Sequence, residues 1–125
     1  MKNNNEILNQ YDVKIEKVWK DKKRYFGAPI SFTEYSLSED RIFVKIGLLN
    51  DRHQETLLYR IKDISVQKNF FQQLFGVGTV VLQTLDASSP YISLKSIKRP
   101  EAVKEVIHDY VERAKKGASI EQILG

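Results

Sequence analysis

The sequence predicts a mainly β protein of the α+β class, with about seven short antiparallel strands followed by one amphipathic helix. Apolar and polar residues alternate along much of residues 31–97, which is the period of half-buried strands. From Pro100 onward the apolar residues recur every three or four positions, which is the period of a helix. We therefore expect a β-barrel or sandwich that is capped by a C-terminal α-helix.

The length is that of a single domain. The chain has 125 residues, and its 42% hydrophobic and 29% charged residues are typical of a soluble globular protein. We expect a tail over residues 1–10, one domain over residues 11–117 and a short C-terminal segment over residues 118–125. No apolar run approaches the roughly 20 residues of a membrane helix, and the polar N-terminus has no apolar signal segment, so we expect a cytoplasmic protein.

Seven segments carry the alternation and are separated by turn-forming residues. The expected strands occupy residues 13–19, 32–37, 42–49, 54–60, 65–68, 79–85 and 91–97. The polar turn Ser38-Glu39-Asp40 joins the second and third strands into a hairpin. The first strand has an irregularity near Glu16 and Lys17 and leads into a charged loop over residues 20–29. A bend at residues 61–64 precedes the fifth strand.

The C-terminal helix begins at Pro100, since proline is favoured at the first helical position. Its apolar stripe consists of Val103, Val106, Ile107, Tyr110, Val111 and Ala114. We expect Gly117 to end this helix and Ser119 to begin a separate short turn as part of a capping box with Gln122.

The residue types and their spacing argue against catalysis. There is no cysteine, which excludes disulfides, thiol nucleophiles and Cys-ligated metals. His53, in a predicted turn, and His108, on the predicted helix, form no metal-ligand pair. Gly76-Val77-Gly78 is half of a dinucleotide fingerprint but precedes a strand, so it predicts a backbone corner. Glu39 and Asp40 are ordinary turn residues. We expect no catalytic residue, no cofactor and no metal, and we expect that the protein is not an enzyme.

Three stretches of the sequence resemble the bacterial PH-like (pleckstrin homology) domain family. They cover residues 35–49, 57–82 and 95–113, and the middle one is the most specific. It contains a strand ending at Arg60, an Ile-x-x-Ile bend, a glutamine-and-aromatic turn and then Gly-x-Gly before a strand. The resemblance implies two orthogonal antiparallel sheets with a C-terminal helix over one end. Many relatives are attached to membrane helices, and the family has no single activity, so the resemblance implies more about fold than about function.

A basic run lies near the start of the domain. Residues 14–24 hold six positive and two negative residues, although the whole chain has a net charge of only +4. We expect Lys20, Lys22, Lys23 and Arg24 to lie in the first loop, as candidates for contact with an anion or lipid. In PH domains that bind phosphoinositides this loop carries the headgroup site, but here general attraction to an anionic surface is favoured. The favoured interpretation of the run as a whole is a solvated edge strand and loop whose lysines keep the sheet edge from pairing with another chain. Nucleic acid is disfavoured, because few aromatic residues interleave the run.

An aromatic turn is the most prominent apolar feature. Asn69 is expected to cap a short helical turn that holds Phe70, Phe71, Leu74 and Phe75. The favoured interpretation is that two or three of these side chains plug the open end of the barrel. The functional interpretation is that one or two, with Phe70, Phe71 and Phe75 as the candidates, stay exposed and contact a membrane interface or a partner.

The sequence thus favours a non-enzymatic interaction module that binds a protein partner or itself, through a sheet edge or the open side of the barrel. Ile120, Ile123 and Leu124 add an apolar terminal segment that could serve self-association. The alternative is a peripheral membrane module that uses the basic run and the aromatic turn together. The two hypotheses are discriminated by whether both features lie on one face. A small-molecule barrel or an enzyme ranks last, because no convergent polar set is visible.

Overall fold

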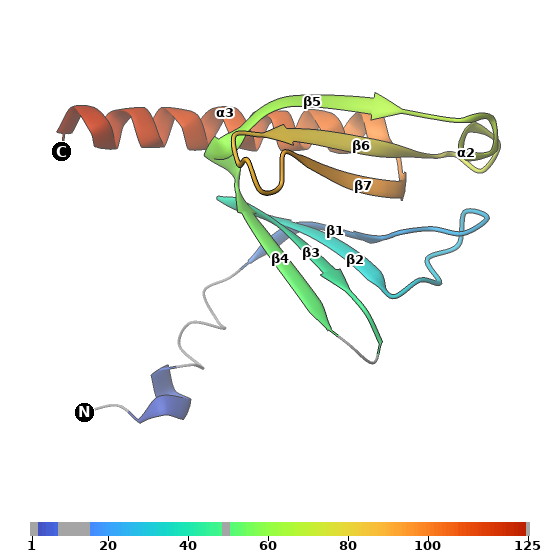
Figure 1. Ribbon diagram of the computed structural model, residues 1–125, viewed down its shortest axis with the longest axis horizontal. Helices are drawn as coiled ribbons and strands as arrows, with labels where there is room; N and C mark the ends of the chain where they lie inside the picture. The colour runs from blue at the N-terminus through green and yellow to red at the C-terminus, as the bar shows by residue number, and fades with distance from the viewer. Residues whose placement is uncertain (1–2, 8–15, 49–50, 125) are drawn as a thin grey trace.

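The protein is an antiparallel β-sandwich with a long C-terminal helix, as the computed structural model shows for residues 3–7, 16–48 and 51–124 (Figure 1). The first sheet has the strand order β1-β2-β3-β4 and the second has the order β5-β6-β7. The strands are β1 (Lys17–Lys22), β2 (Thr33–Ser38), β3 (Arg41–Ile46), β4 (Arg52–Leu57), β5 (Ile61–Gln67), β6 (Val77–Thr84) and β7 (Tyr91–Lys98). These seven antiparallel strands confirm the predicted fold class.

The chain passes from the first sheet to the second through a single 3-10 turn, η1 (Leu58–Arg60). The sequence predicted a strand up to residue 60 and a bend after it, whereas β5 begins at Ile61. The bend comes earlier because Leu58 and Ile61 are both fully buried. Residues three apart lie on the same side of a 3-10 turn, so this geometry buries both.

The first strand is shifted relative to its prediction. β1 pairs with β2 through Lys22, opposite Glu34, with a register irregularity between Lys17 and Trp19. Lys20 and Lys22 are therefore strand residues, and the loop begins after them. His53 likewise lies in β4, where it pairs with Lys45, and not in a turn. The predicted strand positions 13–15 lie outside the described residues.

The helix α3 (Pro100–Leu124) packs against η1, β5 and β6 and seals the core between the sheets. Val103, Ile107 and Val111 of its apolar stripe are buried, as predicted. They join side chains from both sheets. Tyr35 of β2 links the sheets further, because its hydroxyl accepts a hydrogen bond from the backbone N–H of Lys95 in β7 (3.1 Å). Burial raises the pKa of Tyr35.

The helix does not end at Gly117 as predicted but runs on to Leu124. A glycine ends a helix by adopting a positive φ, and Gly117 is absent from the positive-φ glycines of the described residues. A glycine inside a helix costs only about 1 kcal/mol, which good helix formers on either side offset. The separate turn predicted to begin at Ser119 is replaced by continuous helix, and the side chains of residues 119–124 lie outside the described residues.

Substitution of Ile107 tests the core packing. We expect Ile107→Ala to lower the free energy of unfolding by about 2–5 kcal/mol, because it leaves a cavity at a fully buried position. The adjacent Val106 is 42% exposed, so Val106→Ala should cost less than about 1 kcal/mol. Urea unfolding of both variants measures the difference, and equal losses would contradict the packing described.

Substitution of Gly117 tests the length of the helix. Gly117→Ala should raise the free energy of unfolding by about 0.5–1 kcal/mol, because a methyl group at this position meets no atom within 4 Å and alanine favours helix. A loss of stability in thermal unfolding would instead indicate a left-handed residue and a helix that ends there.

Candidate functional site

Two segments that are far apart in the sequence meet at one end of the molecule. They are the β1–β2 loop at residues 23–32 and the short helix α2 (Phe70–Leu74) (Figure 1). The ring of Phe26 in the loop lies edge-on to that of Phe75, with centroids 5.7 Å apart. Gly27 also lies close to Phe75. The fold therefore places the basic run and the aromatic turn next to each other.

A tight turn presents Phe26 at the apex of the loop. Tyr25 and Ala28 exchange two backbone hydrogen bonds of 2.9 and 3.0 Å. The two residues between them, Phe26 and Gly27, have φ values of 53° and 82°. Positive φ at both central positions is typical of type I′ turns, which glycine adopts freely and a residue such as phenylalanine only at a cost of about 1 kcal/mol. Phe26 is thus held in a strained conformation with 83% of its surface exposed.

The helix α2 is held by polar side chains rather than by its aromatic residues. Asn69 caps α2 as predicted, and it forms a capping box with Gln72, with hydrogen bonds of 2.8 and 3.0 Å. The amide of Gln72 also donates to the hydroxyls of Thr79 in β6 and Ser96 in β7. Gln72 therefore occupies the side of α2 that faces the sheet.

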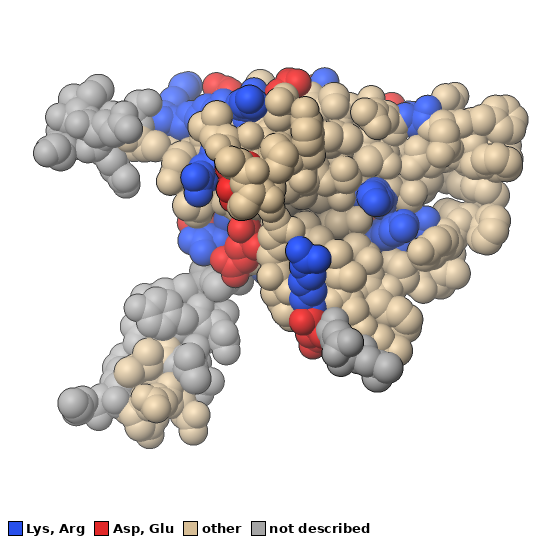
Figure 2. Space-filling model, in the orientation of Figure 1, with Lys and Arg blue, Asp and Glu red and all other residues tan. Residues whose placement is uncertain are grey.

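The aromatic residues of the turn do not plug the barrel, so that interpretation was wrong. Phe70, Phe71 and Leu74 are 66–74% exposed, and Phe75 is 41% exposed. A five-residue helix has only one inward side, and Gln72 takes it. We call the exposed set the aromatic tip: Phe26, Phe70, Phe71, Leu74 and Phe75. In Figure 2 the right-hand end of the molecule, where these two segments lie, shows no charged residue, and basic groups lie further toward the middle of the view.

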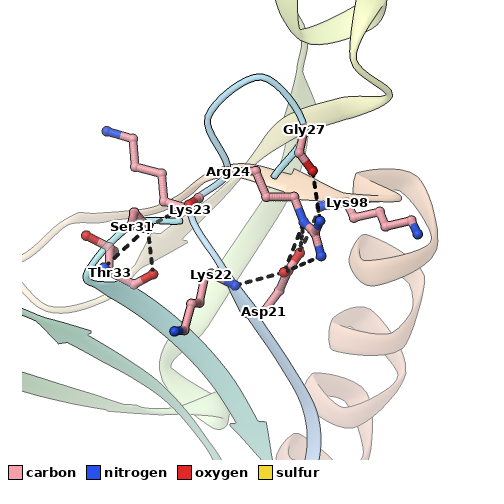
Figure 3. Close-up of polar contacts among 8 residues, drawn as sticks. All are labelled: Asp21, Lys22, Lys23, Arg24, Gly27, Ser31, Thr33 and Lys98. Atoms are coloured by element: carbon pink, nitrogen blue, oxygen red, sulfur yellow. Dashed lines mark hydrogen bonds and ion pairs between the residues drawn. The ribbon is translucent and has the colours of Figure 1, made fainter. Parts of the chain in front are cut away.

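The four predicted anion contacts do not form one cluster. Arg24 makes an ion pair with Asp21 (3.1 Å) and donates to the carbonyl of Gly27 (2.9 Å), so its charge is already neutralised. Lys22 and Lys23 direct their ammonium groups away from this pair, as Figure 3 shows. The ammonium of Lys23 lies 5.3 Å from the ring centroid of Tyr25. Lys20 projects from β1 and is exposed.

Asp21 links β1 to the second sheet. Its carboxylate accepts hydrogen bonds from the Arg24 guanidinium, from the backbone N–H of Lys22 (2.8 Å) and from the backbone N–H of Lys98 at the end of β7 (2.9 Å) (Figure 3). Only 8% of the Asp21 side chain is exposed. This acidic residue, which the sequence analysis passed over, therefore fixes the loop that carries Phe26.

The histidines remain apart in the structure. His53 is exposed in β4 and His108 is exposed on α3. Within the described residues no three His, Cys, Asp or Glu side chains gather as metal ligands would.

Substitution of Asp21 tests this link. Asp21→Ala should lower the free energy of unfolding by about 1–3 kcal/mol, because it leaves the Lys98 N–H and the Arg24 guanidinium without their acceptor. Lys22→Ala, which removes an exposed charge from the next residue, should change it by less than about 0.5 kcal/mol. Chemical unfolding compares the two, and a neutral Asp21→Ala would contradict the structural role.

Comparison with known families agrees with the fold. The sequence model of the bacterial PH domain matches residues 24–111, which is more than half of the chain. The chain belongs to the bacterial PH domain family. The match confirms the resemblance seen in the sequence, and domains of this family are generally interaction modules without catalytic activity. No curated protein and no solved structure matches the chain significantly. None of the helices described in this PH domain has the length and apolarity needed to cross a bilayer.

Proposed function

We propose that this PH domain attaches peripherally to an anionic membrane surface by inserting the aromatic tip into the interface. The observation that carries this proposal is the contact between Phe26 and Phe75. It joins the loop that follows the basic run to the aromatic turn at one end of the molecule. The residue pattern alone favours a protein partner, whereas two such features on one face favour the membrane alternative.

The aromatic tip is suited to an apolar environment. Full burial of a large apolar side chain contributes about 1.5–3 kcal/mol, and interfacial segments enter roughly 5–10 Å into the boundary region. Backbone groups that enter this region must have partners. In the loop, Tyr25 and Ala28 pair their backbone groups with each other, and the carbonyl of Gly27 accepts from Arg24. At the start of α2 the capping box pairs the backbone N–H groups of Asn69 and Gln72. Insertion therefore adds apolar burial with few unpaired polar groups.

The charges around the tip favour an anionic surface. Neither the β1–β2 loop at residues 23–32 nor residues 69–78 contains an aspartate or glutamate. Lys22, the last residue of β1, and Lys23, the first of the loop, are not engaged in the Arg24–Asp21 pair (Figure 3). A basic residue near an anionic membrane contributes about 1 kcal/mol. These two lysines would contact headgroups while the aromatic rings enter below them.

Sedimentation with vesicles tests the proposal. We expect the protein to sediment with phosphatidylcholine vesicles containing phosphatidylglycerol, and to do so less at high salt and with phosphatidylcholine alone. Phe70→Ser with Phe71→Ser should weaken binding more than tenfold with little change in melting temperature, because both side chains are exposed. Lys22→Ala with Lys23→Ala should reduce mainly the dependence on anionic lipid.

A matched control uses exposed aromatic residues away from the tip. Tyr59 in η1 and Tyr91 at the start of β7 are 46% and 61% exposed, and their replacement by serine should leave vesicle binding unchanged. Equal binding by the tip and control variants would contradict the proposal. The protein-partner hypothesis predicts a different result: no vesicle binding, and, for self-association, a dimeric mass in light scattering that Phe70→Ser with Phe71→Ser converts to the monomer.

A further inference from the structure

The two sheets part along the line where β1 runs beside β7. At one end of this line the backbone N–H of Arg24 donates to the carbonyl of Ser96 (2.8 Å). Nearer the middle of β1, it is the side chain of Asp21 that reaches across to β7, where its carboxylate accepts a hydrogen bond from the backbone N–H of Lys98. Beyond Asp21 the strands separate, and a cavity of about 330 Å³ opens between β1, the end of β7 and the first turns of α3.

The walls of this cavity are apolar and its charged groups are mostly basic. Its apolar lining consists of Val18, Trp19, Ala102, Val103 and Val106. Its charged lining consists of Lys20, Asp21, Arg24, Lys98 and Arg99. Asp21 and Arg24 neutralise each other. The other three basic side chains, Lys20, Lys98 and Arg99, form no ion pair with any described residue.

The backbone at the junction of β7 and α3 keeps one of these cations in a strained position. Arg99 has a φ of 51°, in the left-handed region. The carbonyl of Arg99 accepts a hydrogen bond from the backbone N–H of Val103. The next residue, Pro100, has a fully buried side chain. Glycine would adopt this conformation without strain, whereas arginine adopts it at a cost of about 1 kcal/mol. Strained residues of this kind cluster at functional sites.

We propose that this cavity binds a small anionic amphiphile: a single phosphate or carboxylate group joined to a short apolar body. Lys20, Lys98 and Arg99 attract the anion, and the apolar wall receives the body. Val18 and Val106 are 47% and 42% exposed, so a ligand gains apolar burial against both. A volume of about 330 Å³ is near the lower end of small-molecule sites, which suits a chain of about eight carbons. A cationic ligand is disfavoured, because Asp21 already accepts from Arg24 and from two backbone N–H groups.

The protein carries its own reporter for this site. Trp19 is the one tryptophan of the sequence, and it lines the cavity. Titration with monomeric octyl phosphate should produce a saturable change in Trp19 fluorescence. Octanol, which lacks the charge, and inorganic phosphate, which lacks the chain, should each bind at least tenfold more weakly.

Substitutions at the cavity test the basic contacts. Lys98→Ala with Arg99→Ala should weaken octyl phosphate binding at least tenfold, and Lys20→Ala, on a different element, should weaken it in the same direction. Lys115→Ala with Lys116→Ala removes the same charge from α3 about 20 Å along the helix axis and should change the affinity less than twofold. Circular dichroism confirms that each variant is folded. A non-saturable change, equal binding of octanol, or equal affinity of the cavity and control variants would overturn the proposal.

Two further experiments distinguish this site from the aromatic tip and identify the source of the ligand. Phe70→Ser with Phe71→Ser should leave octyl phosphate binding unchanged, because these residues do not line the cavity. Loss of binding in that variant would overturn a separate site. Vesicle sedimentation of the Lys98→Ala, Arg99→Ala variant is unchanged if the ligand is a free amphiphile and weaker if it is a membrane lipid. In both cases the cavity binds an anionic group joined to an apolar chain.

Discussion

The Asp21 carboxylate holds the two sheets together at their open corner. Antiparallel sheets of four and three strands share one core, and just after β1 the backbone N–H of Arg24 donates to the carbonyl of Ser96 in β7. Asp21 extends this junction by accepting the N–H of Lys98, and its pair with Arg24 orders the start of the β1–β2 loop. Phe26 reaches Phe75 from this ordered loop. The same residue marks the point beyond which the cavity opens.

The described side chains of the basic run therefore lie in four different environments. Lys17 lies over the ring of Phe43, where burial lowers its pKa, and Arg24 is committed to Asp21. Lys22 and Lys23 point away from that pair (Figure 3), while Lys20 borders the cavity. Because these side chains have different partners and directions, the described part of the basic run is not one anion site. It supplies charge to two surfaces instead.

The aromatic turn shows how a local polar residue can override a hydrophobic pattern. Four large apolar residues in six positions favoured a buried plug, since aromatic residues chiefly serve cores. Gln72 instead reaches hydroxyls on β6 and β7 and closes the capping box, which turns the rings outward. The cap at Asn69 was visible in the sequence, but the acceptors of the Gln72 amide come from strands that follow later in the chain. The exposed position of Phe26 was likewise invisible, because it depends on a left-handed turn.

The sequence by itself determined the strand alternation, the hairpin at residues 38–40, the cap at Asn69 and the buried helical stripe of Val103, Ile107 and Val111. Each of these depends on periodicity or on neighbours within a few positions. The tertiary structure decided where the chain turns between the sheets, that the Gln72 amide faces Thr79 and Ser96, and that Phe26 and Phe75 meet. These outcomes depend on contacts between residues far apart in the chain, whose free energies outweigh local preferences of about 1 kcal/mol.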